Sequence, residues 1–157
     1  MTVLRPMNPN TFVAYKTAEV ASFAEENVAS GRWPVEGALQ RSLAEFDELL
    51  PEGLSTAENF LLEIVEPTGE LVVGYLWFAN ADRGGQRVAF VYDIQILEPH
   101  RRQGYARQAL VELEEIVKKM GLPRISLHVS GANPSAQALY EEIGFKIMGI
   151  SMSKPIA

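Results

Sequence analysis

The 157-residue sequence contains no cysteine and only two histidines, His100 and His128. Without thiols the chain can form no disulfide, thiolate metal site or cysteine acyl-enzyme. Because the two histidines also lack metal-ligand spacing, we expect no metal site. No apolar run approaches the ~20 residues of a membrane-spanning helix, and the first ten residues lack the apolar segment of a signal peptide. We therefore expect a soluble, cytoplasmic protein that does not contact membranes.

Positive charge is also scarce. Lys and Arg number 14 against 20 Asp and Glu, which gives a formal net charge of -6. Phosphate backbones repel an acidic chain, so we expect no nucleic-acid partner and favour cationic small molecules. Residues 1–60 hold nine acidic and four basic side chains, whereas Arg101, Arg102 and Arg107 cluster in the second half. Either the two halves bind ligands of opposite charge, or the surface charge simply fluctuates along the chain.

The composition is otherwise that of a globular domain, with 47% hydrophobic and 22% charged residues. Strand-like segments alternate with turn signals in the middle of the chain. We expect strands over residues 2–6, 59–66, 70–80 and 88–97, the last three joined by turns at 67–69 and 82–87. Two helices should lie between the first two strands. One is expected over 11–30, capped by Asn10, and one over 33–50 with an apolar face of Val35, Leu39, Leu43, Phe46 and Leu50.

After residue 97 the pattern changes to alternating helices and strands. A 3–4 spacing of apolar residues predicts a helix over 106–120, and Asn133-Pro134 is typical of the start of another. We expect strands over 124–130 and 145–153. A strand–helix–strand–helix–strand run after an antiparallel meander predicts an α/β fold with a mixed sheet. With no linker in the sequence, we expect a single domain over 1–157.

The segment Arg101-Arg102-Gln103-Gly104-Tyr105-Ala106 lies between a predicted strand and a helix start. The first N–H groups of a helix have no partner within the helix, and the helix dipole adds positive potential there. Glycine allows close approach to phosphate oxygens, and arginines add charge-assisted hydrogen bonds. These features favour a pyrophosphate site. Considered alone, the segment fits a solvated basic turn better than a phosphate site, and it matches neither a Walker loop nor a Rossmann fingerprint.

A second motif follows, Asn-Pro-Ser-Ala-Gln-Ala-Leu-Tyr-Glu-Glu-Ile-Gly-Phe over residues 133–145. Together the two motifs resemble the signatures of the GNAT superfamily of N-acetyltransferases, Arg/Gln-x-x-Gly-x-Gly/Ala and Asn-x-x-Ala-x-x-Leu-Tyr-x-x-x-Gly-Phe. The resemblance is firm over 88–150, looser over 59–80 and only topological over 1–58. Ala106 stands where glycine is commoner in the family. The resemblance implies that the parallel strands 88–97 and 124–130 splay apart and that acetyl-CoA binds between them as cosubstrate.

The same resemblance assigns roles to residues. The backbone of Ile94, Gln95 and Ile96 would pair with the pantetheine arm, and Asn133 would contact the cofactor. The pyrophosphate would be held by Arg101 and by the amides from Arg102 to Arg107, through Gln103, Gly104, Tyr105 and Ala106. Tyr140 would be the general acid for the departing thiolate. Tyrosine holds its proton at neutral pH because its ordinary pKa is near ~10; the alternative for Tyr140 is an aromatic residue of the core.

The acceptor side is less defined. His128 is the preferred general base, since histidine titrates near ~6.5, but it could also be a structural histidine. Asp93, Glu25, Glu26 or a water chain could act instead. In the GNAT family, the region that corresponds to residues 1–58 of this sequence, with its two helices, shapes the acceptor pocket. The acidic character of these residues here favours a cationic amine. We therefore expect acetyl transfer from acetyl-CoA to a primary amine by direct attack in a ternary complex, with a non-catalytic acyl-CoA sensor as the alternative. Homodimerisation through 145–153 stays open.

Overall fold

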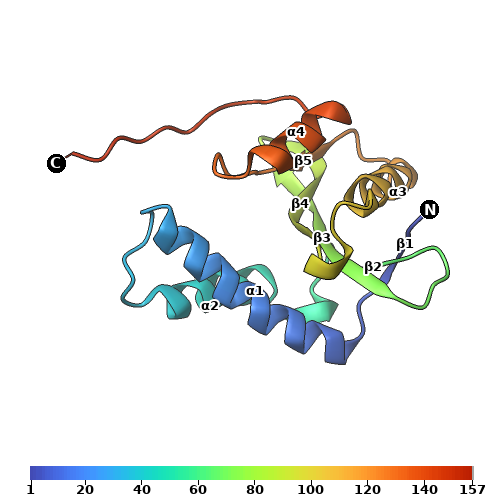
Figure 1. Ribbon diagram of the computed structural model, residues 1–157, viewed down its shortest axis with the longest axis horizontal. Helices are drawn as coiled ribbons and strands as arrows, with labels where there is room; N and C mark the ends of the chain where they lie inside the picture. Colours follow the sequence, from blue (N-terminus) through green and yellow to red (C-terminus); the bar gives the residue numbers. More distant parts are fainter. Residues whose placement is uncertain (157) are drawn as a thin grey trace. The chain divides into compact units, whose positions relative to one another are not determined.

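The computed structural model describes residues 1–156, which fall into two compact units, residues 1–126 and the residues from 127 onward. A five-stranded sheet follows the chain order β1-β2-β3-β4-β5 (Figure 1). Its strands are β1 (Val3–Pro6), β2 (Asn59–Val65), β3 (Val72–Arg83), β4 (Gln86–Ile96) and β5 (Ile125–Leu127). The helices are α1 (Pro9–Ala29), α2 (Ala38–Leu49), α3 (Tyr105–Lys119) and α4 (Pro134–Glu142), with single 3-10 turns η1 (Gly53–Ser55) and η2 (Glu98–His100).

The sheet is mixed. Strands β1 to β4 pair antiparallel in sequence order, and β5 lies beside β4 as the parallel neighbour. The β3–β4 hairpin turns on Gly84 and Gly85, whose φ values of 66° and 85° suit a tight two-residue turn. At the same end of the sheet, the Ala89 N–H donates to the Arg124 carbonyl at 2.9 Å. The predicted α/β class with a mixed sheet is confirmed.

Helices α1 and α2 pack against each other and onto one face of β2 and β3. The shared apolar cluster consists of Met7, Tyr15, Val20, Phe46, Leu50, Leu61 and Trp77. The rings of Phe46 and Trp77 lie 5.6 Å apart, and the Trp77 indole donates to Asn59 Oδ1 at 2.9 Å. Burying large aromatic rings contributes much of the stability of such an interface. This packing fixes the rotation of α1, and with it the side chains that α1 directs at β4.

The start of α1 differs from the prediction. Asn8, not Asn10, caps the helix, because Asn8 Oδ1 accepts from the Thr11 N–H at 2.8 Å and Pro9 occupies the first helical turn. An Asn-Pro pair starts this helix, as another starts α4.

The second helix was also predicted too long, and of its predicted apolar face only Phe46 and Leu50 are buried. It begins at Ala38, after Gly37 adopts a left-handed φ of 77°. Its buried side chains are Ala38, Ser42 and Phe46, and the Ser42 hydroxyl donates to the Val20 carbonyl of α1 at 2.7 Å. Two small residues let the helices approach closely, so the larger Val35, Leu39 and Leu43 stay exposed. Apolar spacing alone could not show this.

The later elements are partly as expected. Helix α3 matches, and α4 is capped by Asn133, whose Oδ1 accepts from the Ala136 N–H at 3.2 Å. Strand β5 is shorter than the predicted 124–130 and ends at Leu127. The predicted strand over 145–153 is wrong, because the structure gives the described residues 145–156 neither helix nor strand. Alternating apolar residues favour a strand, but a strand forms only when another strand pairs with it.

Candidate active site

Strand β4 carries a bulge at Tyr92. Trp77 of β3 is opposite Asp93 and Phe78 is opposite Val91, so Tyr92 has no opposite residue. Because consecutive residues of β3 face opposite sides of the sheet, their partners Asp93 and Val91 also face opposite sides. In a regular strand these two residues would share a face. The bulge therefore turns Asp93 toward α1, and bulges commonly redirect side chains in this way beside active sites.

A hydrogen-bonded cluster joins α1 to β4 at this point. The Tyr15 hydroxyl donates to Asp93 Oδ2 at 2.7 Å. The Gln95 amide donates to the same oxygen at 2.8 Å and also to Glu19 Oε1. Tyr15 and Glu19 are four residues apart, so they share one face of α1. One amide group thus holds the carboxyl groups of Glu19 and Asp93 together.

Burial changes the protonation of this cluster. Burial and the nearby charge of Asp93 raise the pKa of Glu19 to about 7, against the hydrogen bond from Gln95. Burial also raises the pKa of Asp93, although the bonds from Tyr15 and Gln95 oppose that rise. Desolvation and the charge of Asp93 raise the pKa of Tyr15, which therefore keeps its proton. A carboxyl group that titrates near neutral pH is suited to accept a proton in catalysis.

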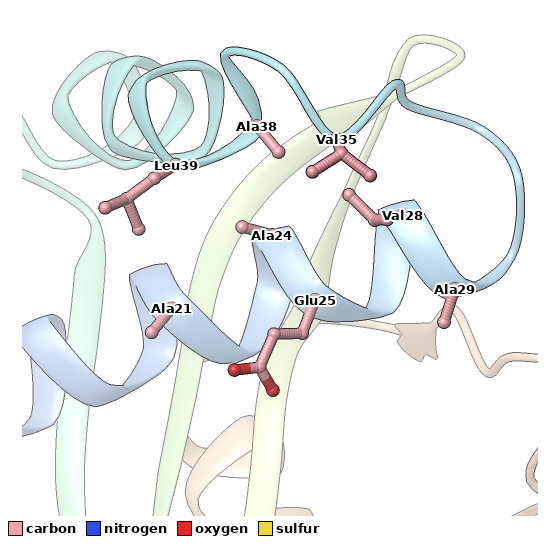
Figure 2. A pocket seen from close by; sticks show the side chains of 8 residues that line it. All are labelled: Ala21, Ala24, Glu25, Val28, Ala29, Val35, Ala38 and Leu39. Carbon is pink, nitrogen blue, oxygen red and sulfur yellow. The ribbon is translucent and has the colours of Figure 1, made fainter.

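The acidic residues of α1 lie on different faces. The charge of Glu26 raises the pKa of both Glu19 and Asp93, which agrees with its position seven residues after Glu19. Glu25 instead borders an apolar groove of about 430 Å³ between α1 and the start of α2, shown in Figure 2. The orientation of Asp93 could not be predicted from the sequence, and Glu19 and Tyr15 were not among the predicted site residues. The spacing of four between them was a signal, but many exposed helix faces show the same spacing.

Near its C-terminal end, β4 directs backbone N–H and carbonyl groups to the edge that faces away from β3. The Leu97 N–H donates to the Val73 carbonyl at 2.8 Å, which directs Leu97 toward β3. In an antiparallel pair the alternate residues, here Ile96 and Ile94, direct their N–H and carbonyl groups away from β3. The Arg101 guanidinium donates to the Ile96 carbonyl at 2.8 Å and so attaches the following loop to this edge.

The loop from Arg101 to Gly104 ends at the start of α3. Arg102 and Gly104 both have left-handed φ values, 63° and 81°, and residues 101–104 are exposed. Gly104 immediately precedes α3, a helix of 15 residues, and has no side chain that could cap it. No side chain therefore accepts a hydrogen bond from the first N–H groups of this helix at the cap position. A Cβ at Gly104 would meet only Gln108 Nε2, at 4.0 Å. Successive N–H groups in such turns form concave anion sites, and the residues present fit a pyrophosphate.

The remaining predicted residues lie in the second unit. Tyr140 is on α4, where its ring lies 5.7 Å from that of Phe145 and its carbonyl accepts from the Phe145 N–H at 2.9 Å. Asn133 caps the same helix. His128 is exposed and follows the last residue of β5. The structure thus brings Asp93 and Gln95 together with Glu19 in the first unit, and the roles assigned to Tyr140, Asn133 and His128 stay predictions.

Comparison with known proteins decides the family. The model of the acetyltransferase (GNAT) family matches residues 11–145. The chain belongs to the GNAT acetyltransferase family. It is 38% identical over 154 residues to the uncharacterized N-acetyltransferase YycN of Bacillus subtilis, with 98% of each chain covered. It is 30% identical over 153 residues to the uncharacterized N-acetyltransferase YdgE of the same organism, with 98% of this chain and 97% of YdgE covered. The predicted resemblance is confirmed.

Solved structures agree. The crystal structure of YycN superposes on this acetyltransferase with a TM-score of 0.93 at 37% identity, covering 100% of this chain and 99% of YycN. AAC(6')-Iy, solved with the bisubstrate analogue CoA-S-monomethyl-acetylneamine, has the same fold at 15% identity, with a TM-score of 0.62 and 100% and 99% coverage. The protein is therefore an acyltransferase of a family that uses acetyl-CoA as cosubstrate. No helix in the described part of the chain is long and apolar enough to cross a membrane.

Proposed function

We propose that this acetyltransferase moves the acetyl group of acetyl-CoA to a primary amine by direct attack in a ternary complex. The observation that carries the proposal is the pair of carboxyl groups, Glu19 and Asp93, joined through Gln95 beside the β4 bulge. A chain without cysteine has no cysteine acyl-enzyme route, which supports direct transfer. Named N-acetyltransferases among the relatives support an enzyme over an acyl-CoA sensor.

The first unit supplies the groups that would hold acetyl-CoA. Amides of Arg102 to Arg107 receive the pyrophosphate, helped by Arg101, and the open edge at Ile94 and Ile96 pairs with the pantetheine arm. The bound cosubstrate contributes an acetyl thioester. The Ile94 N–H, which is directed away from β3, is the backbone donor available to polarise a carbonyl at that edge. Asn133 adds a cofactor contact from the second unit.

Two protons have to move in this reaction. An amine arrives mostly as an ammonium ion and must lose a proton before nitrogen can attack carbon. Glu19, with a pKa of about 7, accepts that proton, while the Gln95 amide keeps the carboxyl in position. Nitrogen then attacks the thioester carbon, the carbon–sulfur bond breaks, and Tyr140 gives its proton to the sulfur. The second proton, which nitrogen loses as the amide forms, returns to the Tyr140 oxygen, so the products are the amide, the CoA thiol and the one proton taken up by Glu19. His128 is the second candidate for the base.

The acceptor we propose is cationic. Glu19, Asp93 and Glu26 concentrate negative charge on one side of α1, since the charge of Glu26 raises the pKa of both Glu19 and Asp93. A second positive charge on the acceptor would be attracted to Glu26 while the reacting amine gives up its proton to Glu19. Polyamines, aminoglycosides, lysine side chains and peptide N-termini all belong to this class.

Calorimetry with acetyl-CoA, followed by a turnover assay, tests the function. Binding with a dissociation constant of about 1–100 µM is expected, in the range usual for enzyme substrates. Thiol release from acetyl-CoA should then depend on the added amine, and dicationic amines should exceed neutral ones of the same length. Binding without turnover on a broad amine panel would favour the sensor, and no binding of acetyl-CoA or CoA would contradict both functions.

Substituting Tyr140 with phenylalanine tests the acid. Tyr140→Phe should lower kcat by about 100-fold, as expected for loss of a general acid, and should change acetyl-CoA affinity less than twofold, because only the hydroxyl is lost. Single-turnover kinetics and calorimetry measure the two effects. An unchanged melting temperature would show that α4 is intact, and an unchanged kcat would remove Tyr140 from the mechanism.

A further inference from the structure

Tyr15 has no part in the proton transfers of the proposed reaction, although its hydroxyl lies inside the carboxyl cluster. The residue is 4% exposed, and its ring packs edge to face against that of Tyr75 at 5.3 Å. A phenylalanine ring would pack in the same way. The hydroxyl instead donates to Asp93 Oδ2 at 2.7 Å and so joins α1 to β4. Because a buried hydroxyl is costly without a partner, this bond is a specific feature of the cluster.

The two carboxyl groups of the cluster receive different numbers of hydrogen bonds. Asp93 Oδ2 accepts from both the Tyr15 hydroxyl and the Gln95 amide. Within the described part of the chain, the Gln95 amide is the one donor to Glu19. A hydrogen bond donated to a carboxylate favours its charged form, and the charge of one carboxylate disfavours ionisation of the other. The number of donors therefore favours a charged Asp93 and a protonated Glu19.

Burial acts against this assignment. Desolvation is the largest cause that raises the pKa of Asp93, and the bond from Tyr15 is the largest that opposes it, ahead of the bond from Gln95. Gln95 also donates to Glu19, so its amide favours the charged form of both carboxyl groups. The bond from Tyr15 is made to Asp93 alone within the described cluster. This bond is therefore the contact that distinguishes the two carboxyl groups.

The other ionisable groups around the pair do not distinguish its members. On α1, the charge of Glu26 raises the pKa of both carboxyl groups. On β3, Tyr75 keeps its proton, because burial and the charge of Glu63 raise its pKa. Glu63 itself, on β2, is paired with Arg5 Nε at 2.8 Å. Hence none of these groups can replace the bond from Tyr15.

We propose that the Tyr15 hydroxyl is a positioning group, which keeps the negative charge of the pair on Asp93 and the exchangeable proton on Glu19. Without this hydroxyl, the proton would move to the buried Asp93, and Glu19 would lose its role as the group that titrates near neutral pH. The consequence for catalysis rests on the proposed function, in which Glu19 is the base. The position of the proton does not, because it can be measured in the free protein.

Carbon-13 NMR of the side-chain carboxyl groups, between about pH 4 and 9 and without acetyl-CoA or amine, tests the proposal. In wild type, the Glu19 carboxyl carbon should titrate near pH 7, with only a small step on Asp93. In Tyr15→Phe, the step should appear on Asp93. It should also move upward by about half to one pH unit, because the carboxylate has lost a charge-stabilising donor.

Tyr75→Phe is the matched control. This variant removes a hydroxyl from the other ring of the same aromatic pair, and that hydroxyl responds to Glu63. Its carboxyl titration should equal that of wild type. Both variants keep their rings, and melting profiles check that each is folded.

Asp93→Asn tests whether Tyr15 acts through Asp93. In this variant Glu19 stays buried but loses the neighbouring charge that raises its pKa, so its titration should move downward from 7. Adding Tyr15→Phe to Asp93→Asn should shift the Glu19 titration no further, because the group through which Tyr15 acts is no longer ionisable.

Turnover provides a second measurement. If Glu19 is the base, kcat/KM of Tyr15→Phe should be about two- to fivefold below wild type at pH 7, as the upward shift requires, and should approach wild type at pH 9. A structural defect would lower the rate at every pH.

The inference would be overturned by a wild-type carboxyl titration in Tyr15→Phe, or by equal shifts in Tyr15→Phe and Tyr75→Phe. A further shift in the double variant would also overturn it, since Tyr15 would then act by another route. A changed titration in Tyr15→Phe with an unchanged pH–rate profile would support the position of the proton and contradict Glu19 as the base. Failure of the inference and failure of the proposed function are therefore distinguishable.

Discussion

Replacing Gly104 with glutamate is expected to weaken acetyl-CoA binding by at least ~100-fold. Gly104 has a left-handed φ of 81° and precedes the N–H groups at the start of α3, which have no side-chain cap. A carboxylate placed about 5 Å from a phosphate charge costs about 3 kcal/mol at an effective dielectric constant near 20, which alone corresponds to a ~100-fold loss. A non-glycine residue at this φ adds about 1–2 kcal/mol of strain. Calorimetry with acetyl-CoA measures the loss.

Gly104→Asn is the matched control. Asparagine tolerates left-handed backbone better than other residues and carries no charge, and the space around the Cβ position is open. This variant should therefore bind acetyl-CoA within about tenfold of wild type, since it retains most of the backbone geometry. Full binding by Gly104→Glu would show that the phosphates bind elsewhere, and equal loss in both variants would assign the effect to backbone strain.

The second large effect is expected from Glu19→Gln. Loss of the proton acceptor should lower kcat/KM by about 10²–10³-fold, within the usual contribution of general base catalysis. In wild type, kcat/KM should rise with pH and level off above about 7, the pKa to which burial and Asp93 raise Glu19. The variant should lose that inflection. Rates measured between pH 5.5 and 9 with one dicationic amine provide the test.

His128→Asn separates the two candidate bases. If Glu19 is the base, this variant keeps both the rate and the inflection near pH 7. If the inflection disappears in His128→Asn and remains in Glu19→Gln, the base is His128 and our assignment of Glu19 is wrong. Asparagine removes the titratable ring but keeps a polar side chain at this exposed position.

The same carboxyl group should lower stability at neutral pH. Because the pKa of Glu19 rises from 4.5 to about 7 on folding, the native state binds more protons than the unfolded state between these values. The favourable contribution is therefore complete below pH 4.5 and is lost as pH rises through 7. After discounting for partial exposure, Glu19→Gln should be more stable than wild type by about 1–2 kcal/mol at pH 8. Urea unfolding at pH 4.5 and 8 measures the difference.

Much of the fold was predictable because its signals are local. Gly84-Gly85 specifies a tight hairpin turn, and Asn133-Pro134 specifies a helix start. Apart from the cap of α1, where the local Asn8-Pro9 pair was overlooked, the errors arose where packing between distant segments decides the structure. The contact between α1 and α2 is made by Ala38 and Ser42, whose small size an apolar periodicity does not register. Whether residues 145–153 form a strand depends on pairing with another strand, which the described residues do not show.

In the candidate site, too, the part formed by consecutive residues could be predicted and the part assembled by packing could not. The loop from Arg101 to Gly104 is continuous in sequence, so its residue types and its place before a helix were enough to predict an anion site. The carboxyl cluster is not continuous, since Glu19 and Gln95 are 76 residues apart and meet only because α1 packs against β4. The bulge at Tyr92 was also invisible in the sequence, because it exists only in the pairing between β3 and β4.

The extra residue Tyr92 changes which side of the sheet the following residues of β4 face. Before Tyr92, Val88 and Val91 belong to the apolar interior; after it, Asp93 and Gln95 belong to the polar cluster with α1. One strand thus serves two environments with separate alternation patterns. Selection can therefore change the side chains of the polar cluster without disturbing those that stabilise the sheet. Deleting Tyr92 would restore regular pairing without turning Asp93 over, because Asp93 would still lie opposite Trp77 and Val91 opposite Phe78.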